Sequence, residues 1–498
     1  MKPVRPRATR PISVRKALAA ALLALTALPA AADEAELLRK LEALERETAE
    51  LRRQLESLHQ SEPAAAVAQP SAQRSSHDHD AHARGDGRPQ IAGAGLEPLK
   101  LGTLPSANAF NPAISVIFDG FWHHDGVKGE SGEIIEEAAG FHGHHDDDGH
   151  EHGSLKQGFN LAHTEIVMSA SVDNYFDALL NLAVDEDGIE VEEAYGVTRN
   201  LPAGLQVKFG KFYSGVGYIN AQHPHEWDFV DRPLPHHLMF GDHGLNDSGV
   251  QLTWVPPLPT YTLVGLELLQ GDNEALANYV GETDSEPVAG ALRERSGPRL
   301  VTGFIKVGPD LGPDHALQAG LFGGRASVHQ ELHDHGHGAN YLEGSTWFAG
   351  TDWVWQYDRG GAHGHGRLRL QGEYLYRVKD LETAASLDEP AFAVGNQRRS
   401  TQDGLYVQGV YGIAPRWTTG LRYEAAGLTS RLDRPDGTID YDDSRRISAN
   451  VAWNPTEFSR LRLQWGRAGI AGDEGREWFN QFYLQYQRAL GAHGAHKF

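Results

Sequence analysis

The sequence contains no cysteine. A disulfide framework is therefore excluded, and so is a lipid attached at a cleavage-site cysteine. Positive charge is also in deficit, because 45 Lys and Arg stand against 67 Asp and Glu, for a formal net charge of −22. Proteins that bind nucleic acid need a basic surface for the phosphates, so this balance argues against such a partner.

Long apolar segments are missing as well. Residues 17–28 are apolar but too few to cross a bilayer as a helix, and they lie between a basic stretch and three alanines at 30–32. This arrangement predicts a secretory signal peptide over residues 1–32 rather than a membrane anchor, because the polar segment 33–53 follows at once. No later apolar run is long enough for a spanning helix. A membrane location for the rest of the chain would therefore require a closed β-barrel.

Residues 33–60 carry a leucine stripe at alternating spacings of three and four, with Thr48 in the one gap. Such a heptad pattern predicts a short periplasmic coiled coil that joins copies of the chain, and a single helix packed on its own barrel is the alternative. Residues 61–112 are rich in Pro, Gly and His without apolar periodicity, which predicts a linker. The leucines of the expected trimer contact are Leu37, Leu41, Leu44, Leu51, Leu55 and Leu58.

From residue 113 onward apolar and polar residues alternate, as where Leu461, Leu463 and Trp465 are separated by polar side chains. Strands of this kind have one apolar and one wet face. The expected strands are longer than the five or six residues usual in globular proteins and suit a tilted membrane span. We predict an all-β, antiparallel transmembrane β-barrel of about 16 strands over residues 113–498. The expected strands are 113–122, 158–171, 176–184, 189–198, 204–213, 248–256, 261–271, 299–308, 315–328, 345–357, 365–378, 402–414, 416–429, 444–455, 459–470 and 477–490.

The connections between these strands alternate between short and mostly long. Short turns on one rim and long loops on the other are typical of outer-membrane barrels, and they place both chain ends in the periplasm. The chain ends at Phe498, which shares the apolar parity of the last strand, as in the signal read by the barrel-assembly machinery. We therefore expect a protein surrounded by outer-membrane lipid in a Gram-negative bacterium. The long loops are expected at 123–157, 214–247, 272–298, 329–344, 379–401 and 430–443.

The predicted barrel and coiled coil, with the stretches GLQVKFGKFYSGVG, GLYVQGVYGIAPRWTTGLRYE and RISANVAWNPTEFSRLRLQWGR, resemble the phosphate-selective porin O/P-like family. The resemblance covers roughly residues 113–498. It implies a trimeric, water-filled, non-energised channel. Some members prefer anions through rows of basic residues along the lumen, but those rows cannot be matched residue by residue here. The resemblance thus implies a passive porin and leaves the solute open.

Histidine is abundant, at 26 residues, and clusters with Asp and Glu mainly in the expected outer loops. Imidazole and carboxylate together suit Zn²⁺, Cu²⁺ or Ni²⁺. Their close spacing in flexible loops predicts weak, exchangeable binding of Zn²⁺ or a similar divalent metal, with no required cofactor. Solvated loops without metal are the alternative. The candidate ligands are His142, His144, His145, Asp146, Asp147, His150, His152, His333, His335 and His337.

The loop 214–247 differs from the others because Pro, Trp, Phe and Met are spread through it, which favours an ordered structure. In sixteen-stranded porins the corresponding third outer loop folds into the lumen and forms the constriction. An acidic and His-rich constriction of that sort would favour cations, and a surface cap that stabilises the trimer is the alternative. The candidate constriction residues are His223, His225, Glu226, Asp228, Asp231, His236, His237, Asp242 and His243.

The parity expected to face the lumen carries charges of both signs, as a general porin wall should. Its basic members suit an anion path equally well. The candidate wall residues are Lys208, Arg367, Arg369, Arg377, Arg422, Arg460, Arg462, Glu373 and Glu424.

No nucleophile elbow, zinc-protease motif or phosphate-cradling glycine loop occurs in the sequence. We therefore predict that the protein is not an enzyme. The leading hypothesis is a passive outer-membrane porin for small hydrophilic solutes or ions, whose loops bind divalent metal and admit zinc. An anion- or phosphate-selective porin is one alternative, and a surface metal-binding barrel without an open pore is another.

Overall fold

The computed structural model describes residues 112–139, 155–162, 164–185, 188–283, 288–334, 339–387, 393–472 and 475–491. The predicted signal peptide (1–32), the coiled coil (33–60) with its leucines, nearly all of the linker (61–112) and Phe498 lie outside these residues. None of the described helices is both long enough and apolar enough to cross a membrane.

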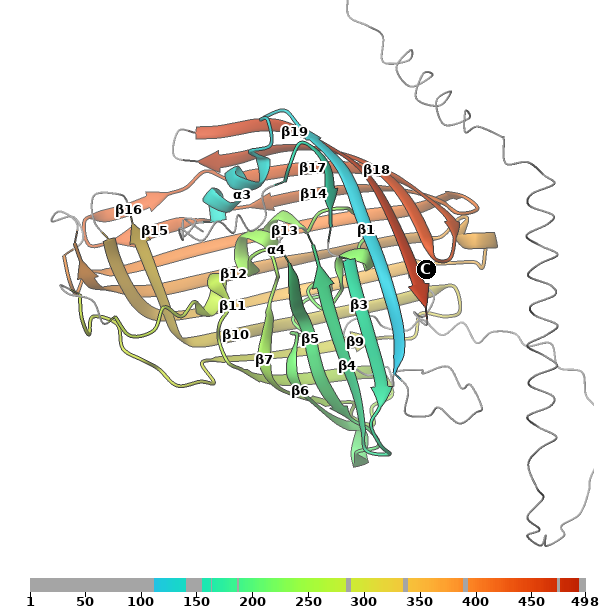
Figure 1. The fold of residues 1–498 in the computed structure, drawn as a ribbon, viewed down its shortest axis with the longest axis horizontal. Coiled ribbons are helices and arrows are strands. Elements are labelled where there is room, and N and C mark those ends of the chain that lie inside the picture. Colours follow the sequence, from blue (N-terminus) through green and yellow to red (C-terminus); the bar gives the residue numbers. More distant parts are fainter. Residues whose placement is uncertain are drawn as a thin grey trace, which may run out of the picture. The chain divides into compact units, whose positions relative to one another are not determined.

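The described strands form one antiparallel sheet that closes on itself, because the first strand pairs with the last (Figure 1). Sixteen strands make the wall, so the predicted barrel and its strand number are confirmed. The wall strands are β1 (Ala113–Asp125), β3 (Thr164–Ser171), β4 (Phe176–Val184), β5 (Ile189–Thr198), β6 (Leu205–Tyr213), β7 (Asn246–Trp254), β8 (Tyr261–Leu269), β9 (Leu300–Gly308), β10 (His315–Asp334), β11 (Ala339–Tyr357), β12 (Leu368–Ser386), β13 (Gln397–Ala414), β14 (Trp417–Ala426), β17 (Ser444–Thr456), β18 (Ser459–Gly472) and β19 (Gly475–Gly491).

Three short strands supplement this wall. β2 (Gly158–Leu161) pairs with β1 just before β3 begins, so the single strand expected at 158–171 is interrupted. β15 (Arg431–Arg434) and β16 (Gly437–Asp440) form a hairpin, and β15 extends the sheet beside the outer end of β13.

Two of the expected long loops, 329–344 and 379–401, are wrong. The strands β10 to β13 run for 20, 19, 19 and 18 residues, and they take up most of both segments. The reason is that the outer ends of these strands lie beyond the apolar band and carry polar side chains at consecutive positions, as at His329, Gln330 and Glu331 of β10. Without lipid on one side nothing requires alternation, so the sequence pattern ends before the strand does.

The short connections lie at the rim where β1 begins and β19 ends, and the longer ones lie at the opposite, outer rim. The outer connections carry the helices α3 (Ser131–Ala139), η2 (Pro224–Glu226), α4 (Leu234–Phe240) and α5 (Glu274–Ala277). Two single turns, η1 (Pro202–Gly204) and η3 (Ala362–Gly364), belong to the short connections.

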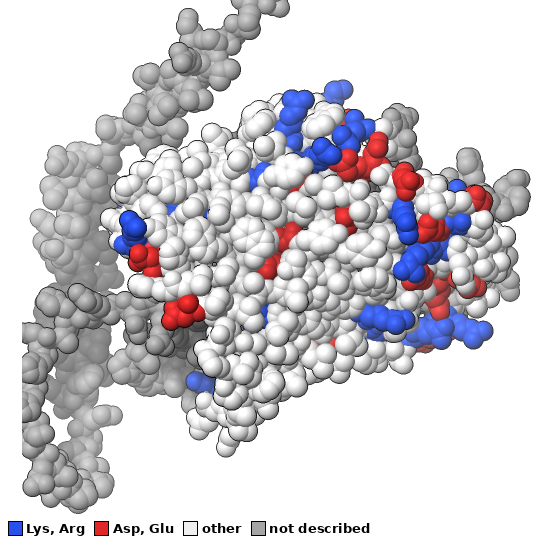
Figure 2. All heavy atoms as spheres, turned by 180° about the vertical axis from the view of Figure 1, so that it is seen from behind, with Lys and Arg blue, Asp and Glu red and all other residues white. Residues whose placement is uncertain are grey.

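The wall is apolar outside and polar inside. On β19, Phe482, Leu484 and Tyr486 are 40–45% exposed, whereas Gln481 and Gln485 on the alternate positions are at most 2% exposed. Figure 2 shows the outer surface that results, with charged side chains gathered mainly toward one end and a largely uncharged wall beside them. An exposed apolar wall suits lipid hydrocarbon, and a closed barrel leaves no backbone group unpaired in it. The chain thus has the fold of a Gram-negative outer-membrane protein, and the expected localisation holds.

The interior is not uniformly polar. Phe304 of β9, Phe322 of β10 and Phe348 of β11 are buried and pack in one cluster with Met239 and Phe240 of α4. This cluster, here called the apolar side of the lumen, has the character of a soluble protein's core. The wall near β1, β3, β14 and β17 to β19 is lined by buried polar and charged groups without such a cluster, and buried charges such as Glu267 of β8 and Lys306 of β9 lie beside the cluster as well.

Candidate functional site

The connection 214–245, between β6 and β7, lies inside the barrel; it is here called the inserted loop. The Lys306 ammonium of β9 donates to the carbonyl oxygen of Gly217 at 2.7 Å. On nearly the opposite wall, the Arg462 guanidinium of β18 donates to the carbonyl oxygen of Trp227 at 2.6 Å. A single loop therefore spans the lumen between two walls.

The inserted loop keeps its shape through both polar and apolar contacts. The buried Asn220 amide donates to the carbonyl oxygens of Ser214 and Leu245 and accepts from the Leu245 amide, so it joins the two ends of the loop. Trp227 and Phe229 are at most 5% exposed although they lie in a connection. Apolar side chains spaced along the loop thus bury themselves in the lumen, which is the burial that the hydrophobic effect favours.

One side of the inserted loop is held by arginines of the wall. The Asp231 carboxylate lies 2.7 Å from Arg422 of β14 and 2.6 Å from Arg446 of β17. Asp228 pairs in the same way with Arg369 of β12. Burial would raise the pKa of the Asp231 carboxyl, but the two guanidinium groups hold it well below its usual range. Acidic groups of the loop thus neutralise basic groups of the wall.

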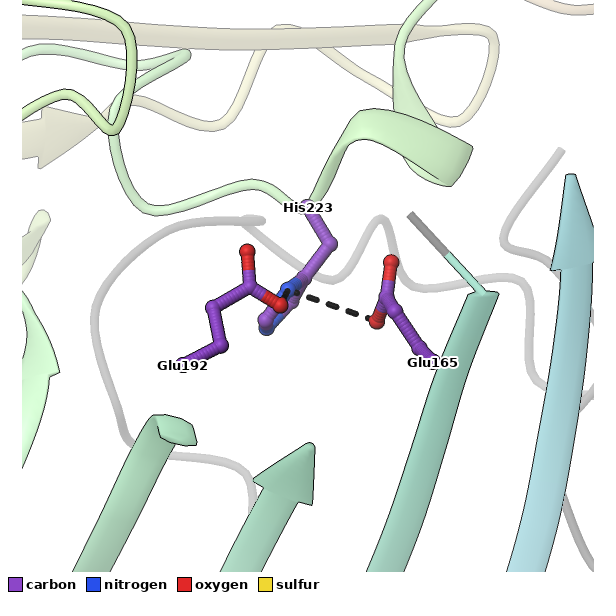
Figure 3. A group of neighbouring side chains, drawn as sticks. All are labelled: Glu165, Glu192 and His223. Atoms are coloured by element: carbon purple, nitrogen blue, oxygen red, sulfur yellow. Dashed lines mark ion pairs between the residues drawn. The ribbon is translucent and has the colours of Figure 1, made fainter. Parts of the chain in front are cut away.

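The other side of the inserted loop meets carboxylates. His223 places Nε2 at 2.9 Å from Glu193 and Nδ1 at 3.3 Å and 3.4 Å from Glu192 and Glu165. Figure 3 shows the imidazole between the last two carboxylates. His225 follows with Nδ1 at 2.6 Å from the second oxygen of Glu165. Burial lowers the pKa of His223, but the three carboxylates outweigh it and raise the pKa well above its usual value.

A β-bulge in β5 makes this arrangement. Asn181 of β4 is opposite Glu193, and Leu182 is opposite Val191, so Glu192 is the extra residue. A bulge re-aims side chains that would otherwise alternate between faces. Consecutive carboxylates, Glu192 and Glu193, therefore both reach His223.

Of the other predicted constriction residues, His236 contacts the wall, whereas Glu226, His237 and Asp242 bond within the inserted loop. His236 lies 3.1 Å from Glu373 of β12 with both side chains fully buried, and Glu226 accepts the backbone N–H of His223 at the start of η2. His237 instead pairs with Asp242 inside the loop at 2.7 Å. Asp242 is exposed, and so is His243.

Most predicted wall residues face inward, but they contact different partners. Lys208 is buried over the Tyr195 ring, and Arg460 joins Arg462 in bonding the carbonyl oxygen of Trp227. Arg377 donates to the carbonyl oxygens of Met239 and Ala275, and Glu424 accepts from Arg446. Arg367 pairs with Asp358 at the short-turn rim just before β12, away from the inserted loop.

The predicted metal ligands of the outer loops are not brought together in the described part of the chain. His333 lies in β10, where its Nε2 is 2.8 Å from Glu331. His142, His144, His145, Asp146, Asp147, His150, His152, His335 and His337 lie outside the described residues.

Sequence reasoning missed several charged residues of the lumen, among them Glu165, Glu193, Lys306 and Arg446. Glu165 carried a usable signal, because it is the one charged residue in the strand Thr164–Ser171. A lone charge in a membrane-spanning strand is expected to face the lumen, since lipid would exclude it.

Comparison with known proteins identifies a relative without an assigned function. No family model matches it. An uncharacterized protein of Aquifex aeolicus (strain VF5) is 37% identical over 402 residues, which cover 79% of this chain and 81% of that protein. The chain belongs to the family of this Aquifex protein. Membership in the phosphate-selective porin O/P-like family stays a prediction.

Several solved outer-membrane proteins are similar to this family member in structure. In-vitro folded OmpT of Vibrio cholerae is 11% identical with a TM-score of 0.46, over 78% of this chain and 99% of that chain. The outer membrane channel DcaP of Acinetobacter baumannii is 13% identical with a TM-score of 0.46, over 76% and 96%. An anion-selective porin from Comamonas acidovorans is 12% identical with a TM-score of 0.42, over 76% and 99%. These similarities are too low to transfer ligand or selectivity to this chain.

Proposed function

We propose that the protein is an outer-membrane channel for passive diffusion of small hydrophilic solutes or ions, with the inserted loop controlling the passage. The observation that supports this most is the ordered loop 214–245, which spans the lumen of a closed barrel between β9 and β18. A loop in this position determines what can pass, because every path through the barrel must run beside it.

We expect the path of the solutes to run on the side of the lumen opposite the apolar cluster. Phe304 and Phe348 pack on the loop in the apolar cluster, and ions would not cross such a core. Opposite it, Asp119 of β1 binds Gln485 and Gln487 of β19, and Arg462 of β18 lies close enough to interact with Asp119 electrostatically. We expect solutes to pass between this polar wall and the loop.

Passage requires the inserted loop to move. Asp119, Glu165 and Arg462 come from three strands of the polar wall, yet each is at most 2% exposed. Water therefore has little access to the wall at this level while the loop is docked. This burial also favours the second candidate function, a barrel that binds ligands at the cell surface without an open pore.

Selectivity follows from how the charges are paired. Asp228 and Asp231 neutralise arginines of the wall, so neither set alone decides between cations and anions. We therefore expect weak selectivity. Reversal potentials in a salt gradient measure it directly, and strong anion preference would instead favour the phosphate-type alternative.

Two finer parts of this proposal concern the segments outside the described residues. We expect the leucine stripe of residues 33–60 to hold three copies together and residues 142–152 to bind zinc weakly. Deleting residues 33–60 should convert trimers to monomers in analytical ultracentrifugation. Deleting residues 141–152 should lower zinc stoichiometry and leave the barrel folded.

Planar-bilayer recording tests the proposed function. The purified full-length protein is added to a lipid bilayer, and step-like conductance changes are expected. Heat-modifiable migration in gels, which reports a folded barrel, is measured on the same sample. A folded protein that never produces conductance steps would overturn the channel and favour the barrel without a pore.

A further inference from the structure

Three possible metal-ligand atoms, two carboxylate oxygens and one imidazole nitrogen, converge on one point between the wall and the inserted loop. One carboxylate oxygen each of Glu165 and Glu192 and one ring nitrogen of His223 all lie within 4.8 Å of one another (Figure 3). The amide nitrogen of Asn181 occupies the space among them, at 3.0 Å from each carboxylate and 3.3 Å from the imidazole Nδ1. A single hydrogen-bond donor thus stands where three ligands meet.

We propose that Glu165, Glu192 and His223 bind one divalent transition-metal ion and thereby cross-link the inserted loop to the β3–β5 wall. Imidazole nitrogen with carboxylate oxygen is a donor set for Zn²⁺ and related ions, with bonds of about 2.0–2.2 Å. The ligands need to close in by about 1 Å in place of the amide nitrogen. The site differs from the His-rich outer loops, because its ligands come from β3, β5 and the inserted loop.

The atoms of these three ligands that point away from the site are already held by partners. Nε2 of His223 faces Glu193 at 2.9 Å, the second oxygen of Glu165 faces His225 at 2.6 Å, and Tyr213 donates to the second oxygen of Glu192. Metal-binding imidazoles in proteins are oriented in this way by a carboxylate on the other ring nitrogen. The cluster therefore has the outer partners of a metal site as well as its ligands.

Asn181 offers a fourth ligand. Its side chain is 1% exposed, and its Oδ1 has no hydrogen-bond partner among the described residues. A half-turn of the amide exchanges Nδ2 for Oδ1, and withdrawal of the side chain by about 2 Å, the length of one metal–oxygen bond, leaves the carbonyl oxygen directed at the ion. Two carboxylates, one imidazole and one amide oxygen complete the four-coordinate set that zinc prefers.

The charge of the cluster can accommodate a dication. Three carboxylates, of Glu165, Glu192 and Glu193, are buried within this cluster. Arg232 interacts electrostatically with Glu192 and supplies one positive charge. Without metal, the protonated imidazoles of His223 and His225, whose pKa values are raised, bring the total to zero. A dication that replaces these two protons keeps the total at zero, and buried charge is tolerated only when it is compensated.

Zinc titration of the full-length protein by calorimetry tests the site. ZnCl₂ is added to the folded barrel at pH 7.5 in detergent, with Glu192→Gln and His223→Gln beside the wild type. Each substitution should remove one zinc equivalent or weaken its binding at least tenfold. His223→Gln should also abolish the proton release that accompanies zinc binding to the protonated imidazole at this site. His237→Gln, in the same loop but paired with Asp242, is the matched control and should keep the equivalent.

Asn181→Asp tests the site in the opposite direction. It exchanges the amide for a fourth charged ligand and should tighten zinc binding at least tenfold, so the result does not depend on a loss of folding. The proposal is overturned if the wild type and His223→Gln bind the same zinc with the same affinity, or if Asn181→Asp leaves the affinity unchanged. Because zinc binding and conductance are measured separately, either proposal can fail without the other.

Discussion

Asp231 and Arg422 are 191 residues apart in the chain, yet their side chains form an ion pair of 2.7 Å inside the barrel. The second oxygen of the same carboxylate lies 2.6 Å from Arg446 of the neighbouring strand β17. One acidic side chain of the inserted loop thus connects to two strands.

Asp231→Asn should release this side of the inserted loop. Removing one partner of a buried ion pair costs about 3–5 kcal/mol, because the other charges stay buried without compensation. We expect a lower unfolding midpoint in urea, longer open states in planar bilayers and a shift of the reversal potential toward anions. Asp436→Asn is the control, since Asp436 is 71% exposed in its pair with Arg434 and such pairs contribute about 0–1 kcal/mol. Equal effects of the two substitutions would contradict this role.

Alkaline pH should loosen the other side of the loop. The pKa of His223 is raised in the folded protein by Glu165, Glu192 and Glu193, against the opposing effect of burial. A raised pKa means that the stabilisation is complete below the ordinary histidine value of about 6.5 and is lost as the pH rises through the folded value. Between pH 7 and pH 10 the open probability of single channels should therefore rise.

The His223→Gln variant separates this effect from the titration of other groups. Glutamine fills a similar volume without a titratable ring, so its open probability should already be high at pH 7 and should change little up to pH 10. A variant whose pH profile matches that of the wild type would assign the effect to another group.

Gly217→Ala should displace the first part of the inserted loop. Gly217 has φ +66°, and a Cβ there would lie 2.3 Å from Oε2 of Glu373. Gly312→Ala is a matched control, because Gly312 also has a positive φ of +94° but nothing within 4 Å of its added Cβ. Backbone strain is common to both, so an excess loss of about 1–3 kcal/mol in the first variant reports the overpacking. Equal urea midpoints would mean that Glu373 moves aside freely.

Leu484→Arg tests whether the exposed wall faces lipid. Leu484 is 45% exposed on β19, and an arginine on the lipid face costs about 2–4 kcal/mol near the bilayer midplane. Ile439→Arg in β16 is the control, because Ile439 is an apolar side chain, 37% exposed, in the outer hairpin. Unfolding in liposomes should separate the two variants. If both are tolerated equally, the face around Leu484 does not contact hydrocarbon.

The wall of the barrel could be predicted from the sequence where lipid contacts it. Lipid requires an apolar side chain at every second position, and the expected limits of β4 and β5 coincide with the observed ones. Beyond the apolar band this requirement ends. The outer parts of β10 and β12 are therefore strands whose residues, such as those around Glu331 and Asp380, show no alternation.

The candidate site could be predicted only in part. Alternation assigns neighbouring residues to opposite faces, so it cannot place both Glu192 and Glu193 beside His223; the bulge that does so has no signature in the alternation. The charge of Asp231 and Arg422 was visible in the sequence, but their pairing was not. It depends on how the loop folds within the lumen, which buried side chains such as Trp227 determine.

The seam between β1 and β19 has a consequence for the order of assembly. It pairs Ser115 with Gly491 and Asp125 with Gln481. One edge of β1 therefore has no hydrogen-bonding partner until β19 has been synthesised. Contacts between such distant parts of a chain form slowly. The inserted loop comes from the middle of the chain, and we expect it to be enclosed when the seam closes rather than to enter afterwards. A delay in pairing the final strand would therefore leave the loop's charged groups facing lipid or water. We expect closure of this seam to be the last step in assembly of the barrel.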